Sequence, residues 1–122
     1  MAKRAMIING TPEEVEQCTL LFTIQGWTTL CATTGNGAAQ TRVVFHRPDL
    51  VVIFADAFPD ASIRTAYALR HLNGTIHIPV LCVGSNPMTA DTIARLIPDL
   101  PLIPAHTIAI EFTRLLRAED HT

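Results

Sequence analysis

Short apolar runs alternate with longer mixed segments along the whole chain. The runs recur at a spacing of about 22 to 25 residues, and each is followed by turn residues and then by a segment with helical periodicity. Runs of this length fit strands that are buried on both faces of a parallel sheet. The pattern predicts an α/β fold of five βα units, with strands at Arg4–Ile8, Thr28–Ala32, Leu50–Phe54, Val80–Val83 and Leu100–Ile103.

Turn and capping residues mark the ends of several expected helices. Thr11–Glu14 has the residues of a capping box with a proline at the first helical position, so the first helix should begin there. Gly26 should end that helix, residues 35–37 should lead into the second, and the third should begin near Asp60. Asn73-Gly74 is expected to stop the third helix in a left-handed conformation.

Apolar stripes and prolines refine this arrangement. Two sets of apolar residues at helical spacing are expected to face the core: Ile63, Ala66, Tyr67 and Leu69 in the third helix, and Ile108, Phe112, Leu115 and Leu116 in the last. The fifth apolar run contains Pro101 and lies between Pro98 and Pro104. Because proline cannot donate a backbone hydrogen bond to a neighbouring strand, this run should form a sheet edge.

Composition narrows the classes of function. The 122 residues fit a single domain, residues 1–122, and 48% hydrophobic against 16% charged residues suits a sheet covered on both faces. Nine basic and 11 acidic residues are spread along the chain, so nucleic-acid binding is not expected. Apolar stretches fall short of the roughly 18 residues of a membrane span. We therefore expect a cytoplasmic protein without membrane contact.

The cysteines and histidines show no ligand spacing. Cys18, Cys31 and Cys82 form no C-x-x-C motif, and the five histidines form no H-x-x-x-H motif. The sequence therefore predicts no metal site and no cofactor. The cysteines are expected to be small buried hydrophobic residues in a reducing compartment.

Candidate chemistry gathers where the strands end. In a doubly wound sheet, ligands bind beyond the carboxyl ends of the central strands. Here that crevice should collect Asn9, Gly10, Asp56, Gly84, Ser85, Ile103 and Pro104. Together with the segments Arg47–Val52 and Ile78–Leu81 and with Pro59, these positions make the full chain resemble the CheY-like receiver domains of two-component signalling.

The resemblance implies a flavodoxin-like sheet of order 2-1-3-4-5 and a specific set of site positions. Working receivers hold Mg²⁺ with an acidic pair after strand one and phosphorylate an aspartate after strand three. They also place Thr or Ser after strand four and Lys after strand five. In this chain the acidic pair falls on Asn9-Gly10, the Thr/Ser position on Gly84 or Ser85, and the Lys position on Ile103. The resemblance thus implies a pseudo-receiver that binds Mg²⁺ weakly at most.

Asp56 is the candidate for a vestigial phosphoacceptor. Family spacing counted forward from Pro48 places the acceptor at Phe54, whereas spacing counted backward from Pro59 places it at Ala55. In the forward register Asp56 shares the face of Phe54 and reaches the crevice, which is our expectation; in the backward register it points away. The alternative role is a strand-end acid that hydrogen-bonds the next turn or helps to cap the third helix.

Three functions follow. The first is a phosphorelay-type signalling module, not an enzyme, that binds a histidine kinase or another signalling protein without aspartyl phosphate. By resemblance its interface, which is also a candidate contact for a homodimer, lies on the fourth helix, fifth strand and fifth helix, at Ala90, Ile93, Leu96, Ile97, Ile108 and Glu111. The others are a conventional receiver phosphorylated on Asp56, and a small-molecule or nucleotide binder that uses Asn9, Ser85 and Asn86.

Overall fold

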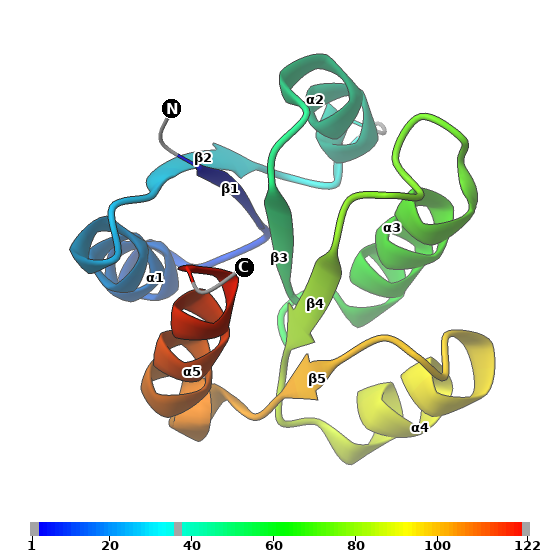
Figure 1. Cartoon of the computed structure of the whole chain (residues 1–122). Helices are drawn as coiled ribbons and strands as arrows, with labels where there is room; N and C mark the ends of the chain where they lie inside the picture. The colour runs from blue at the N-terminus through cyan, green and yellow to red at the C-terminus, as the bar shows by residue number, and fades with distance from the viewer. Residues whose placement is uncertain (1–2, 36–37, 121–122) are drawn as a thin grey trace.

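The computed structural model describes residues 3–35 and 38–120 as a parallel sheet covered by helices (Figure 1). The five strands are hydrogen-bonded in the order β2-β1-β3-β4-β5. They are β1 (Arg4–Ile8), β2 (Thr28–Ala32), β3 (Leu50–Phe54), β4 (Val80–Val83) and β5 (Leu102–Ile103). The predicted fold class and strand order are therefore confirmed.

The helices lie in two layers with a separate core under each. They are α1 (Pro12–Ile24), α2 (Ala38–His46), α3 (Pro59–His71), α4 (Pro87–Leu96), the 3-10 turn η2 (Ala105–Thr107) and α5 (Ile108–Asp120). Strand β3 supplies both cores, because Val52 and Phe54 pack with residues of α1 and α5 while Val51 and Ile53 pack with residues of α2, α3 and α4. Buried β3 is thus the centre of the domain.

The predicted start and end of α1 are confirmed. The hydroxyl of Thr11 accepts from the backbone N–H of Glu14 at 3.2 Å, and the Glu14 carboxylate accepts from the backbone N–H of Thr11 at 2.8 Å. Gly26 follows the helix with φ of 85°. Helix α3 begins at Pro59, next to the expected Asp60. Of the expected 35–37 turn, residues 36 and 37 lie outside the described residues.

The predicted left-handed stop of α3 at Asn73-Gly74 is wrong. Among the described residues, positive φ angles occur at Asn9, Gly26 and Arg47. The last turn of α3 is instead capped by Thr75, whose hydroxyl donates to the carbonyl oxygen of Leu69 at 2.8 Å. Because this buried side chain satisfies a free helix carbonyl, no left-handed residue is needed.

Strand β5 is shorter than predicted. It begins at Leu102 and not at Leu100, because the backbone N–H of Leu100 donates to Ile97 in a turn at 3.0 Å. Pro101 contributes only its carbonyl oxygen, which accepts from Cys82 at 2.9 Å. The sheet order places β5 at an edge, as its prolines predict.

Some residues expected in the core reach the surface. Tyr67 and Leu115 are 45% and 39% exposed. Cys31 is also exposed, whereas burial raises the pKa of the Cys18 and Cys82 thiols to about 12. Across the described part of the chain, no helix has the length and apolar character to cross a membrane.

Candidate functional site

The strand ends meet at one edge of the sheet, where the chain turns into the helices (Figure 1). Strand β1 leads to Asn9 and Gly10, β3 to Asp56, β4 to Gly84 and Ser85, and β5 to Pro104. The structure therefore brings the sequence-predicted positions to a common edge.

Asn9 holds three segments together at this edge. It has φ of 63°, a left-handed conformation that asparagine tolerates, and is 8% exposed. Its side-chain N–H₂ donates to the hydroxyls of Thr34 at 3.0 Å and Ser62 at 3.1 Å, and its side-chain oxygen accepts from the Thr34 backbone at 3.1 Å. Ser62 in turn donates to the carbonyl oxygen of Phe54 at 3.2 Å. We call Asn9, Thr34 and Ser62 the amide network.

The amide network uses the hydrogen-bonding capacity of Asn9 for structure. Thr34 and Ser62 were not singled out from the sequence, because they lie 25 and 53 residues from Asn9 along the chain. The one signal for Ser62 is its place beside Ile63 on the buried side of α3, where a small polar residue needs a partner.

The space beside Gly10 is filled by an aromatic ring. A Cβ atom at Gly10 would lie 2.9 Å from Val15 and 3.3 Å from the ring of Phe54. Phe54 is buried in the core beneath α1 and α5. Thus the residue that the forward spacing places at the acceptor position is a phenylalanine, and it packs against the second of the two acidic-pair positions.

Asp56 lies over the end of β4. Its carboxylate oxygens are 3.0 and 3.2 Å from the backbone nitrogen of Ser85, which donates to them. A Cβ atom at Gly84 would lie 3.0 Å from the nearer oxygen. Both of these hydrogen bonds run to the β4–α4 loop, and the N-cap position of α3 is Phe58, which makes no side-chain cap hydrogen bond.

The fifth strand brings no cation to this edge. Ile103, at the Lys position, is buried in the core. Lys3, the single lysine of the sequence, precedes β1 at the opposite end of the sheet and lies over the ring of Trp27 at 5.5 Å. In residues 3–35 and 38–120, no group of three or more His, Cys, Asp or Glu side chains is placed to hold a metal ion.

Two hollows lie among the loops that follow the strands. One, of about 380 Å³, is lined by Asn9, Gly10, Thr33, Thr34, Gly35 and Phe58. The other, of about 310 Å³, is lined by Gly84, Ser85, Asn86, Pro87, Ala90, Leu102, Pro104 and His106. Neither lining contains an arginine or a lysine, so neither offers a fixed positive charge to a nucleotide phosphate.

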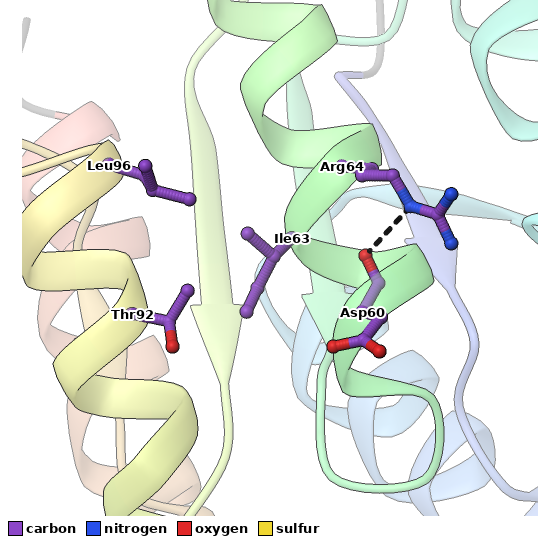
Figure 2. A pocket seen from close by; sticks show the side chains of 5 residues that line it. All are labelled: Asp60, Ile63, Arg64, Thr92 and Leu96. Carbon is purple, nitrogen blue, oxygen red and sulfur yellow. Dashed lines mark hydrogen bonds between the residues drawn. The ribbon is translucent and has the colours of Figure 1, made fainter.

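The expected interface residues divide by exposure. Ile93, Ile97 and Ile108 are buried, which weakens the expectation that they contact a partner. Ala90 and Glu111 are half-buried. Leu96 is 52% exposed, and in Figure 2 it points with Thr92 toward Ile63 across a groove of about 440 Å³ between α4 and α3.

Comparison with known proteins establishes the fold. No protein-family model and no curated protein matches the sequence. The signal receiver domain of a signal transduction histidine kinase from Syntrophus aciditrophicus superposes with a TM-score of 0.72 at 20% identity, over 99% of this chain and 95% of that chain. This is the receiver fold.

Two further solved structures share the receiver fold. The N-terminal domain of a response regulator receiver protein from Methanoculleus marisnigri JR1 has a TM-score of 0.60 at 19% identity, over 98% of this chain and 94% of that one. The anti-anti-sigma factor PhyR from Bartonella quintana has a TM-score of 0.60 at 15% identity, over 99% of this chain and 50% of that one.

Proposed function

We propose that this domain is a pseudo-receiver: a signalling module of the two-component type that acts by binding a protein partner and carries no aspartyl phosphate. It works in the cytoplasm and performs no catalytic step of its own. The fold supports the signalling class, because the matched structures include receivers from a histidine kinase and from a response regulator.

The packing of Phe54 against Gly10 carries the proposal. Phosphoryl transfer depends on charged groups that stabilise the transferring oxygens, and these groups must meet at the strand ends. Here a buried aromatic ring lies against the second acidic-pair position, and a Cβ atom at Gly10 would already be 3.3 Å from that ring. An apolar site of this kind disfavours a carboxylate and the cation it would bind.

The remaining donors fit Mg²⁺ poorly. This cation requires an octahedral shell of oxygen ligands and is usually held by carboxylates together with phosphate oxygens. The Asn9 oxygen already accepts from Thr34, and the Asp56 carboxylate, after β3, already accepts from Ser85. We therefore propose that the domain has no resident cofactor and binds Mg²⁺ weakly at most.

The partner in this proposal is a histidine kinase or another signalling protein, with a second copy of the chain as the alternative. Helix α4 offers exposed apolar side chains for such a contact, since Met88 and Leu96 are 78% and 52% exposed. Leu96 belongs to the sequence-based interface, and Met88 is added to it here because Ile93, Ile97 and Ile108 are buried.

An amide NMR titration with Mg²⁺ followed by beryllofluoride, a mimic of the acyl phosphate, tests the proposal. We expect no saturable shifts at Asn9, Asp56 or Ser85. The Asp56→Asn variant is the matched control, because it removes the carboxylate and shows which shifts are non-specific. In parallel, mass spectrometry after incubation with acetyl phosphate should detect no added phosphoryl group.

Saturable shifts in the wild type that disappear in Asp56→Asn would identify a conventional receiver and overturn the proposal. A phosphoryl adduct on Asp56 would do the same. Absence of both, with the fold intact by NMR, supports the pseudo-receiver.

A further inference from the structure

The carboxylate of Asp56 connects three loops that lie far apart in the sequence. It accepts from the backbone N–H of Ser85, the second residue after β4, at 3.0 and 3.2 Å. The hydroxyl of Ser85 accepts from the backbone N–H of Ala105, after β5, at 3.3 Å. Asp56 itself follows β3. We call Asp56, Ser85 and Ala105 the three-loop network.

The three-loop network reaches the start of helix α4 directly. Asn86, the residue after Ser85, is the N-cap of α4, and its side chain accepts from the backbone N–H of Met88 at 2.9 Å. A carboxylate near the beginning of a helix is also favoured by the partial positive charge of its free N–H groups. The position of Asp56 therefore bears on where α4 begins.

Gly84 is the residue that lets the carboxylate approach. A Cβ atom there would be 3.0 Å from the Asp56 oxygen, a distance that real Cβ atoms rarely show. Gly84 is fixed by its own hydrogen bond from its N–H to the carbonyl oxygen of Ile103 at 3.0 Å. The end of β4 thus presents an open backbone surface on which the Asp56 carboxylate rests.

We infer that Asp56 is a positioning residue: its carboxylate holds the β4–α4 and β5–α5 loops in one arrangement and so shapes the corner made by α4, β5 and η2. This deepens the proposed function and rests on it, because a partner-binding module without a phosphoryl switch needs this surface in place at all times. The hydrogen bond to a charged acceptor is stronger than a neutral one. The corner includes the hollow lined by Ala90, Leu102 and His106.

Site-resolved amide hydrogen exchange on the full chain, without Mg²⁺ or any phosphoryl donor, tests the inference. In Asp56→Ala the Ser85 amide should exchange roughly tenfold faster or more, because it loses a charge-assisted bond. The Ala105 and Met88 amide resonances should shift with it. Asp56→Asn keeps an acceptor oxygen, so it should restore part of the protection. If Asp56 contributed only to global stability, its removal would accelerate the exchange of all amides together.

Two further variants separate the links of the network. Gly84→Ala leaves Asp56 in the sequence but displaces its carboxylate, and should reproduce the fast exchange at Ser85. Ser85→Ala removes only the hydroxyl, and should release the Ala105 amide while the amide at position 85 stays protected. Asp60→Asn, which neutralises an exposed acid at the start of α3, is the matched control and should change none of these rates.

Unchanged Ser85 exchange in Asp56→Ala would overturn the inference. So would uniform acceleration of the amides of β1 and β3 together with Ser85, since that result assigns Asp56 to global stability. The test is independent of the phosphorylation assays. A phosphoryl adduct would reject the pseudo-receiver whatever the exchange rates, and normal exchange in Asp56→Ala would reject the positioning role even if no adduct forms.

Discussion

The edge of the sheet where the strands end has two halves, one at the end of β1 and one at the end of β4, and their polar side chains are held in different ways. On the β1 side, Asn9 is buried and its neutral amide is paired with Thr34 and Ser62. On the β4 side, Asp56 is exposed and its carboxylate accepts from the backbone N–H of Ser85 in the loop after β4. Buried polar groups must be satisfied continuously, whereas exposed ones exchange readily with water. The β1 side is therefore the structural half, fixed by buried contacts, whereas the β4 side is fixed by a hydrogen bond that is open to water.

Phe54 lies between the two halves, and its removal should have the largest effect. We expect Phe54→Ala to lower the free energy of unfolding by about 3 to 5 kcal/mol, because it opens a cavity in the core under α1 and α5. Urea denaturation measures this. The control is Phe58→Ala, which truncates a ring that is 60% exposed and should cost less than about 0.5 kcal/mol. Equal losses would mean that Phe54 contributes no more to stability than an exposed ring does.

Asn9→Asp should break the structural half. A carboxylate cannot donate to the Thr34 and Ser62 hydroxyls, and it buries a charge, so we expect a loss of about 2 to 4 kcal/mol. Burial disfavours the charged form, so the loss should shrink as pH falls and the new carboxyl group is protonated. Denaturation at two pH values checks this. Asn73→Asp, at an exposed loop position, should be nearly neutral.

Gly10→Ala should strain the contact between the halves. The new methyl group would lie 2.9 Å from Val15 and 3.3 Å from Phe54, which predicts a loss of about 1 to 3 kcal/mol in thermal unfolding. Gly74→Ala is the matched control, since its Cβ meets no heavy atom within 4 Å. If both variants unfold alike, the space beside Gly10 is less tightly filled than the packing indicates.

Local patterns in the sequence predicted the sheet well. The first four strands have the predicted bounds because each contains a short apolar run bounded by turn residues, and α1 starts where its capping box places it. Two predicted boundaries were wrong because a group outside the predicted element determines each of them. Leu100 is not part of β5, because its backbone N–H donates to the carbonyl oxygen of Ile97. The end of α3 is capped by Thr75, four residues beyond the helix.

The sequence predicted where the site residues lie but not which hydrogen bonds they make. The rule that parallel strands end at one edge brought Asn9, Asp56 and Ser85 together correctly. It could not show that Asn9 would bond Thr34 and Ser62, or that Asp56 would bond the Ser85 backbone, because these contacts depend on side-chain directions in three dimensions. Family spacing left two registers for the acceptor position, at Phe54 and Ala55, and side-chain alternation could not choose between them because the strand ends at Phe54, before Asp56.

The reciprocal exchange Asp56→Asn should have the smallest effect on stability and sharpens the contrast with Asn9→Asp. Both substitutions interchange an asparagine and an aspartate. For Asp56→Asn, however, we expect the free energy of unfolding to fall by about 1 kcal/mol or less, because the carboxylate is exposed and its hydrogen bond competes with water. Added salt should narrow the difference in melting temperature between wild type and Asp56→Asn, since exposed charges are screened. A salt-independent loss as large as that of Asn9→Asp would place Asp56 in the structural half, and the two halves would then not differ in how they are held.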